Sequence, residues 1–230
     1  GIKYLDGEGY KLSDEEELGI EGIYEADVGL ERPTHGSVGR IYDAGELTGK
    51  YLDFLLGIME KVENTDRSIL IDAANGAASA LVGPLFKNWK GKVSILANHP
   101  DGLNINSGVG VTNMDFLVRN TMDAKADIGI AYDGDTDRVL MCDGKGRIID
   151  GDIMLWVIGR WLKSKGTLGS GVVATVMSNM VLEDLLAKED IKVFRCGVGD
   201  RYVLDTMRKE NSRLGGEQSG HLIALDYANT

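Results

Sequence analysis

The sequence is short of basic residues and of long apolar runs, and each shortage excludes a class of partner. Lys and Arg number 25 against 36 Asp and Glu, which gives a formal net charge of −11. Because nucleic-acid binding depends mainly on Lys and Arg contacts to phosphate, no nucleic-acid partner is expected. The longest apolar stretch, residues 153–162, is interrupted by Gly159 and Arg160 and is too short to cross a bilayer. No membrane partner is expected either.

Cysteine is also scarce. Cys142 and Cys196 are the two thiols, and neither belongs to a CxxC or Cys/His cluster of the kind that binds metal. We interpret both as small buried hydrophobic residues, which is typical of a protein in the reducing cytoplasm. The first residue is Gly1, and the opening GIKYLDGEGY looks like the middle of a strand and turn. The sequence is therefore expected to be an internal part of a longer chain.

What the sequence does contain is the balance of a folded protein, with 43% hydrophobic and 27% charged residues. Its 230 residues suit two compact units and part of a third. Residues 1–40 are predicted to be the end of one domain and a linker, with a helix that starts after Ser13. Two α/β domains are predicted beyond them, at 41–148 and 149–230.

Helical and strand patterns alternate through both predicted domains. A hairpin around the turn at 143–146 is predicted to connect the two domains. The predicted helices are 48–61, 77–88, 115–125, 152–163, 180–187 and 201–209. The predicted strands are 68–72, 92–97, 127–132, 171–176, 192–196 and 222–225. The fold class is therefore α/β, with two such domains in tandem.

An acidic loop follows the apolar strand pattern that ends at Tyr132. Asp133, Asp135 and Asp137 alternate in the segment DGDTDR, at the carboxyl end of a buried strand, where open α/β sheets bind ligands. Three neighbouring carboxylates repel one another unless a cation neutralises them. With oxygen ligands and no nearby His or Cys, the loop favours Mg²⁺ or Mn²⁺ over zinc or copper.

Three alternatives apply to this acidic loop. An EF-hand needs Gly at its sixth position and Glu at its twelfth, where this sequence has Arg138 and Gly144, so that reading fails. A phosphatase-type Asp nucleophile stays open, since an Asp at a strand end can attack phosphorus. A solvated turn also stays open, because Asp and Gly are ordinary turn residues.

A Gly-rich segment, GGEQSGH at residues 215–221, combines closely approachable backbone with polar side chains. Gly216, Glu217, Ser219 and His221 are candidates for binding the hydroxyl groups of a sugar. The alternative is a plain turn between strands.

A second candidate lies at the predicted start of the helix at 201–209. Gly199 and Asp200 precede it and Arg201 opens it, so free backbone N–H groups and a guanidinium could receive a phosphate. Asp200 is the predicted N-cap, and a pure capping role for it stays open. Arg201 is the stronger functional candidate.

Three segments in this order, DGDTDR, VGDRY and GGEQSGH, resemble the metal and sugar loops of the α-D-phosphohexomutase family. The segments at 1–12, 102–110 and 174–183 are most similar to the branch of that family that acts on glucosamine phosphates. The resemblance covers essentially the whole chain. It implies tandem α/β domains with mixed sheets.

The resemblance also implies a reaction. A phosphoserine of the enzyme gives its phosphate to glucosamine 6-phosphate, and the resulting 1,6-bisphosphate returns the other phosphate, leaving glucosamine 1-phosphate. By this resemblance, the three aspartates of the acidic loop bind Mg²⁺, Arg138 helps with the phosphate or with proton transfer, and Glu217 and Ser219 hold sugar hydroxyls. Arg201 is the second catalytic candidate, from its position at the helix start. The expected partner is a phosphorylated hexosamine, with a homodimer as the candidate assembly.

The sequence departs from the family pattern in three ways. It contains no Thr-Ala-Ser-His-Asn-Pro type segment that would carry the phosphoserine, and no final phosphate-binding domain, so the chain is expected to be inactive alone. Thr136 stands where the family usually has Gly, which would be strained if the backbone there needs a positive φ. A phosphomannomutase or phosphoglucomutase, and a non-catalytic phosphosugar-binding module, remain the alternative functions.

Overall fold

The computed structural model describes residues 4–26 and 32–228. The predicted opening segment at 1–3 and the start of the linker at Glu31 lie outside the described residues. The chain divides into two units, one up to Asp53 and one from Phe54, which are described separately. Within the described ranges, no helix has the length and apolar character needed to cross a membrane.

The first unit contains α1 (Asp14–Ala26), η1 (His35–Ser37) and the start of α2 (Gly45–Met59). The helix predicted after Ser13 is confirmed, and its start is a capping box. The backbone N–H of Glu16 donates to Ser13 Oγ (3.2 Å), and the N–H of Ser13 donates to Glu16 Oε2 (2.7 Å). No residue of α1 is buried.

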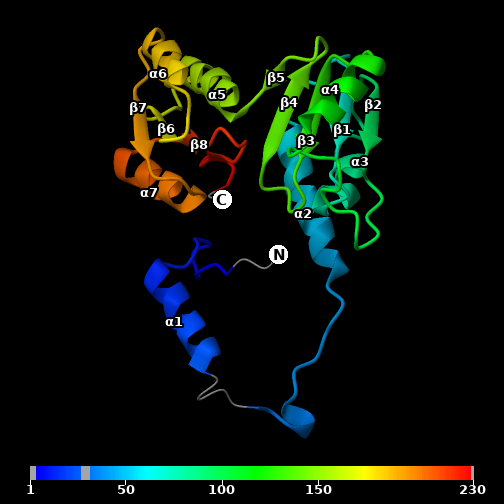
Figure 1. Cartoon of the computed structure of the whole chain (residues 1–230), viewed down its shortest axis with the longest axis vertical. Coiled ribbons are helices and arrows are strands. Elements are labelled where there is room, and N and C mark those ends of the chain that lie inside the picture. Colours follow the sequence, from blue (N-terminus) through cyan, green and yellow to red (C-terminus); the bar gives the residue numbers. More distant parts are fainter. Residues whose placement is uncertain (1–3, 27–31, 229–230) are drawn as a thin grey trace. The chain divides into compact units, whose positions relative to one another are not determined.

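The first sheet of the second unit is mixed, in agreement with the expected fold class. Its strand order is β2 (Val93–Leu96), β1 (Ile69–Asp72), β3 (Ile128–Tyr132), β4 (Val139–Asp143) and β5 (Ile148–Ile149). β1 pairs in parallel with β2 and β3, whereas β4 runs antiparallel to β3 and β5 antiparallel to β4 (Figure 1).

Side chains that alternate along β1 build a core on each face of this sheet. Leu70 packs in a cluster with Leu117 of α4 (Met114–Asp123). Ile71 packs on the opposite face, in a cluster with Ala78 and Val82. This alternation is the two-residue period of a strand, and it places helical layers on both sides of the sheet.

The single helix predicted over 77–88 is wrong. The structure has a short 3₁₀ turn, η2 (Ala77–Ala80), followed by α3 (Val82–Leu85). Pro84 lacks the N–H that a continuous helix would donate to the carbonyl of Ala80, so the helix cannot run through from Ala77.

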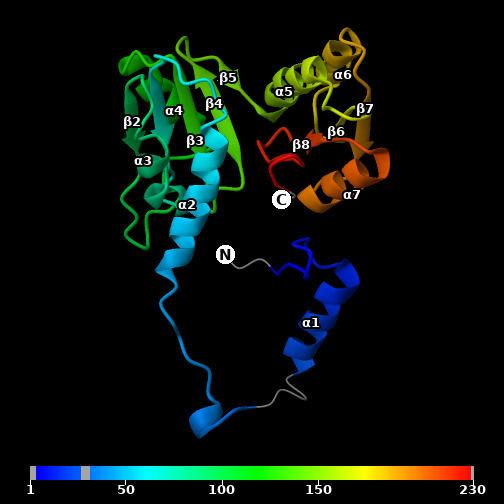
Figure 2. The ribbon, with the colours of Figure 1, turned by 180° about the vertical axis from the view of Figure 1, so that it is seen from behind.

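The second sheet has the order β7 (Val193–Cys196), β6 (Val172–Thr175), β8 (Leu214–Gly216) and β9 (Leu222–Ala224). α5 (Gly151–Lys165) and α6 (Met180–Ala187) lie on one side of it, and α7 (Asp200–Glu210) lies on the other (Figures 1 and 2). Leu155, Leu186 and Leu214 are fully buried together in the core between α5, α6 and the sheet.

Strand β8 was not predicted, because two of its three residues are glycines and the segment reads as a loop. The packing explains Gly215. A Cβ there would lie 2.5 Å from Met207 Sδ and 2.7 Å from Val203 Cγ1, both on α7. Glycine therefore allows α7 to pack closely on the strand.

The two sheets share one topology, in which three parallel strands are followed by an antiparallel one. In each, the turn between the third parallel strand and the antiparallel strand carries candidate residues. Residues 133–138 link β3 to β4, and residues 217–221 link β8 to β9. The shared topology thus places the two predicted loops at corresponding positions.

Candidate functional site

The acidic loop, residues 133–138, brings three carboxylates together. One oxygen from each of Asp133, Asp135 and Asp137 lies within 4.8 Å of the other two. Asp133 is buried, Asp135 is exposed and Asp137 is half-buried, so the group opens from the end of β3 towards solvent. An all-oxygen group of this kind could hold a hard divalent cation.

The turn after β1 packs against the backbone of the acidic loop through a glycine and a hydrogen bond. A Cβ on Gly76 would lie 2.3 Å from the carbonyl oxygen of Gly134, and the N–H of Ala77 donates to that oxygen (2.9 Å). The turn after β1 therefore rests directly on the acidic loop, and a side chain at position 76 would separate them.

Asp72, at the end of β1, fixes a second supporting segment. Its carboxylate accepts from the N–H of Gly110 (2.7 Å) and of Ala74 (2.9 Å). Burial raises the pKa of Asp72, and these two backbone donors act against that rise. A Cβ on Gly110 would lie 2.7 Å from the carbonyl oxygen of Tyr132, directly before the acidic loop.

Arg138 closes the acidic loop onto its own first residue. Its Nε donates to Asp133 Oδ2 (2.9 Å), and its backbone N–H donates to Asp133 Oδ1 (3.1 Å). Its Nε also lies 3.8 Å from Asp137 Oδ1. The Asp133 side chain is 2% exposed and the Arg138 side chain 41% exposed, so the carboxylate is enclosed while the guanidinium reaches solvent.

Thr136 has the positive φ that the sequence analysis described as strained for a β-branched residue. Its φ is 66°, in the left-handed region that disfavours a β-branched residue. Its N–H donates to the carbonyl oxygen of Asp133 (3.2 Å), which closes the turn. Its Oγ1 is buried and has no hydrogen-bond partner within the described part of the chain.

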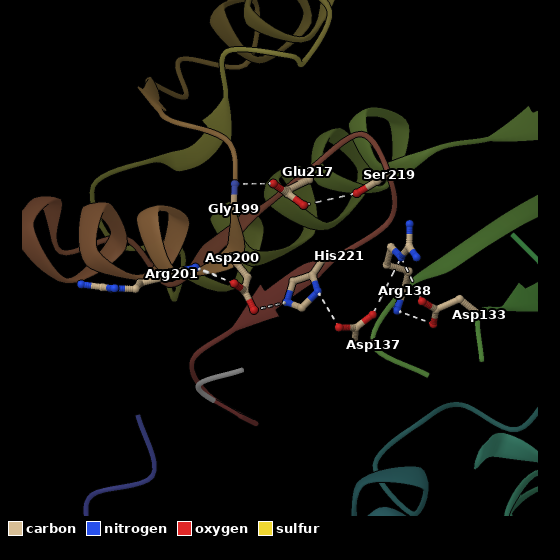
Figure 3. A network of polar contacts seen from close by, with 9 residues as sticks. All are labelled: Asp133, Asp137, Arg138, Gly199, Asp200, Arg201, Glu217, Ser219 and His221. Carbon is tan, nitrogen blue, oxygen red and sulfur yellow. Dashed lines mark hydrogen bonds and ion pairs between the residues drawn. The ribbon is translucent and has the colours of Figure 1, made fainter. Parts of the chain in front are cut away.

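The turn at 217–221 presents Glu217 as an acceptor. Glu217 Oε1 accepts from the N–H of Gly199 (2.9 Å), and Oε2 accepts from Ser219 Oγ (3.3 Å) (Figure 3). The turn therefore contacts the start of α7. Gly216 is the buried last residue of β8, directly before Glu217.

The start of α7 differs from the prediction in one respect. The N-cap is Gly199, with φ 126° and ψ 136°, and Asp200 is the first helical residue. Asp200 Oδ1 accepts from the N–H of Arg201 (2.8 Å). A side chain at position 199 would be strained at this φ, which is why glycine takes the cap position.

His221 joins the two loops. It is 5% exposed, and its Nδ1 lies 3.8 Å from Asp137 Oδ2 while its Nε2 lies 3.8 Å from Asp200 Oδ2. The polar contacts in Figure 3 therefore run from Asp133 through Arg138, Asp137 and His221 to Asp200. His221 Nε2 has no hydrogen-bond partner within residues 4–26 and 32–228.

The structure thus assembles most of the candidate residues in one place, although their functional roles stay predictions. The side chain of Arg201 is the exception, because in Figure 3 it extends away from His221 and the acidic loop. Sequence reasoning missed Gly76, Gly110 and Gly151, whose importance lies in contacts with distant backbone. Their positions next to turns were the available signal.

Both thiols are buried, as expected, and take no part in this network. Burial raises the pKa of the Cys142 and Cys196 thiols. The Glu217 carboxylate adds a smaller rise at Cys196. Both thiols therefore remain neutral at neutral pH.

Two family models match the chain in consecutive segments. Residues 49–146 match the model described as phosphoglucomutase/phosphomannomutase, alpha/beta/alpha domain II. Residues 150–230 match the model of alpha/beta/alpha domain III of the same family.

Individual proteins agree with these matches. The phosphoglucosamine mutase of Bacillus velezensis is 44% identical over 100% of this chain, which covers 52% of that protein. A putative phosphomannomutase from Thermus thermophilus has a similar structure, with a TM-score of 0.77 at 18% identity over 96% of this chain and 50% of its own. N-acetylphosphoglucosamine mutase of Aspergillus fumigatus, solved with GlcNAc-6P and magnesium, has a TM-score of 0.58 at 20% identity, over 75% of this chain and 39% of its own.

Proposed function

Because the chain belongs to the phosphoglucomutase/phosphomannomutase family, we propose that it forms the metal- and sugar-binding part of a phosphoglucosamine mutase. Such an enzyme interconverts glucosamine 6-phosphate and glucosamine 1-phosphate. The observation that carries the proposal is the acidic loop, whose three carboxylates lie close together and whose Asp137 lies 3.8 Å from His221 in the turn at 217–221. The chain spans about half the length of the phosphoglucosamine mutase it matches.

The proposed metal is Mg²⁺, held by Asp133, Asp135 and Asp137. Neighbouring oxygen ligands of a Mg²⁺ ion at about 2.1 Å stand about 3 Å apart, and those on opposite sides about 4.2 Å apart. The oxygens of this loop lie within 4.8 Å of one another, so a small contraction would bring them to that spacing. When bound, the ion would neutralise charge on a phosphoryl group. The Aspergillus neighbour with magnesium supports this choice.

Arg138 is proposed to receive the phosphoryl group beside the metal loop. Its Nε is held by Asp133, which orients the guanidinium plane, and its other N–H groups can donate to phosphate oxygens. Holding one edge of the guanidinium in this way fixes the donor geometry before a phosphosugar arrives. Arg201 is proposed as a more peripheral contributor, because its side chain extends away from this loop (Figure 3).

The turn at 217–221 is proposed to bind the sugar. Each carboxylate oxygen of Glu217 already accepts one hydrogen bond, and the remaining lone pairs can accept hydrogen bonds from sugar hydroxyls. Ser219 can donate or accept beside it. Gly199, Asp200, Gly216 and His221 complete the proposed sugar-binding group.

Phosphoryl transfer within this group would depend on position and charge. The residues present here would orient the phosphosugar and stabilise negative charge on the transferring group. The phosphoserine that donates the phosphate is proposed to come from outside residues 1–230. The proposed compartment is the cytoplasm, in keeping with two buried, unpaired thiols.

The test is the turnover of phosphosugars by the full-length protein with Mg²⁺. Glucosamine 1-phosphate, glucose 1-phosphate and mannose 1-phosphate are compared at equal concentrations, with Glu217→Gln as the variant. The proposal expects preference for the glucosamine substrate and a strong loss in the variant. Preference for glucose or mannose would reassign the sugar. Phosphosugar binding without turnover would instead make the protein a binding module.

A further inference from the structure

We infer that Asp150 and Gly151, at the start of α5, are positioning residues that set the place of Glu217 for the sugar. The inference rests on the proposed function, since it concerns the proposed sugar-binding role of Glu217. Neither residue belongs to the loops described above. Both contact the turn at 217–221, Gly151 through its backbone and Asp150 through its carboxylate.

Gly151 lies against the backbone of Glu217 with no room for a side chain. It is buried, and a Cβ built on it would lie 1.9 Å from the carbonyl oxygen of Glu217 and 2.9 Å from its carbonyl carbon. The N–H of Gly151 also donates to the carbonyl oxygen of Gln218 (3.0 Å). The first turn of α5 is therefore the surface on which this turn rests.

Asp150 connects the same turn to the helix cap. Its Oδ1 accepts from the N–H of Ile153 (3.1 Å), which is the N-cap bond of α5. Its Oδ2 accepts from Gln218 Nε2 (3.3 Å). One carboxylate thus fixes both the start of α5 and the side chain that follows Glu217.

The backbone of Glu217 has little freedom to move away. Its N–H donates to the carbonyl oxygen of His221 (2.9 Å), and its carbonyl oxygen accepts from the N–H of Gly220 (3.0 Å). A methyl group at position 151 would have to displace the Glu217 carbonyl by on the order of 1 Å to reach van der Waals distance. That shift would displace the Glu217 carboxylate relative to the N–H of Gly199 and distort the hydrogen bond between them. Misplacement of a binding group by this distance can cost up to about 100-fold in rate.

Gly159 provides a matched control in the same helix. It is also buried, but a Cβ there would meet Val172 Cγ2 at 3.0 Å and Leu186 Cδ2 at 3.5 Å, which are core side chains. Ala is a better helix former than Gly at both positions. Gly159→Ala therefore tests overpacking of the core, whereas Gly151→Ala tests displacement of the turn.

The experiment compares Gly151→Ala, Gly159→Ala and wild type in the full-length protein. It measures KM and kcat for glucosamine 1-phosphate, the Mg²⁺ concentration for half-maximal activity, and hydrogen exchange at the Gly199 amide. Gly151→Ala is expected to raise KM about tenfold or more. It should also speed exchange at Gly199 and leave the Mg²⁺ requirement unchanged. Gly159→Ala is expected to keep the wild-type KM and exchange rate, whatever it does to the melting temperature.

Asp150→Ser keeps the inference falsifiable if Gly151→Ala does not fold. Ser still caps α5 through its hydroxyl but has no second oxygen to accept from Gln218 Nε2, so KM should rise about fivefold, the loss of one hydrogen bond. Wild-type KM and wild-type Gly199 exchange in Gly151→Ala, or wild-type KM in Asp150→Ser, would overturn the inference. Absence of turnover in the wild type would refute the proposed function. The Gly199 exchange rates would then still decide whether position 151 sets the place of Glu217.

Discussion

Replacing Thr136 with Gly is expected to stabilise the protein. Thr136 sits inside the acidic loop with φ 66°, and its Oγ1 is buried without a hydrogen-bond partner within the described residues. Gly adopts this backbone conformation without steric cost, and it removes the buried hydroxyl. We therefore predict that Thr136, although it lies in a proposed functional loop, makes the folded protein less stable than Gly at this position would.

The size of the gain follows from three effects. The left-handed conformation costs a residue with a Cβ roughly 1–2 kcal/mol. A buried, unpaired hydroxyl costs about 1–3 kcal/mol. The greater freedom of Gly in the unfolded chain opposes these by about 0.5–1 kcal/mol. The net stabilisation is about 1–4 kcal/mol, which corresponds to a rise in melting temperature of about 2–16 °C for a protein of this size.

The assay is thermal and urea unfolding in the presence of a chelator, so that metal binding does not contribute. Lys125→Gly is the matched control, because Lys125 has φ 51° and is exposed. It should gain the backbone part alone, about 1 kcal/mol. Thr136→Val keeps the backbone strain and removes the hydroxyl, so it measures the cost of the buried hydroxyl alone. A Thr136→Gly variant that is no more stable than wild type would refute the reasoning.

Two further substitutions test structural parts of the account. Hydrogen bonds from the Ser68 N–H and hydroxyl, with the Arg67 guanidinium, hold the pKa of Asp127 below its usual 3.8. This carboxylate therefore contributes stability above that pKa and loses it as the pH falls through the folded value. Asp127→Asn should have a lower urea midpoint than wild type at pH 7, and the gap should close below about pH 4; a gap that stays constant with pH would contradict this. Gly76→Ala should cost about 1–3 kcal/mol, since its Cβ would lie 2.3 Å from the Gly134 oxygen, whereas Gly83→Ala, with its nearest contact at 4.0 Å, should be close to neutral in the same unfolding assay. Equal losses of unfolding free energy in Gly76→Ala and Gly83→Ala would contradict the close contact between Gly76 and the Gly134 oxygen.

Local sequence signals predicted elements whose caps are formed by nearby residues. The helix Met180–Ala187 has the predicted bounds, and the side chain of Asn179 accepts from the N–H of Val181 as a cap. The helix start after Ser13 was likewise predicted, and the Ser13 hydroxyl accepts from the N–H of Glu16 there. Elements that form because of tertiary packing had no local sequence signal that could predict them. Strand β8 exists because its glycines let α7 approach, and nothing in the residues 214–216 themselves indicates a strand.

The candidate site shows the same division. The acidic loop could be placed from its position after an apolar strand, and its carboxylates do converge. The approach of His221 to Asp137 and Asp200 could not be predicted, because it joins residues that are far apart in the sequence. The N-cap at Gly199 was misassigned to Asp200, since Asp is the commoner cap and the positive φ of 126° is not visible in sequence.

The most direct test of the central claim is the Mg²⁺ affinity of Asp135→Asn, measured by calorimetry on the full-length protein. Asp123→Asn is the control, because Asp123 is an exposed residue at the end of α4 and its replacement makes the same change in net charge. The account predicts that Asp135→Asn weakens Mg²⁺ binding at least tenfold, about the effect of losing one carboxylate ligand, while Asp123→Asn binds as wild type does. Equal Mg²⁺ affinity in wild type and Asp135→Asn would contradict the claim that the acidic loop holds the metal.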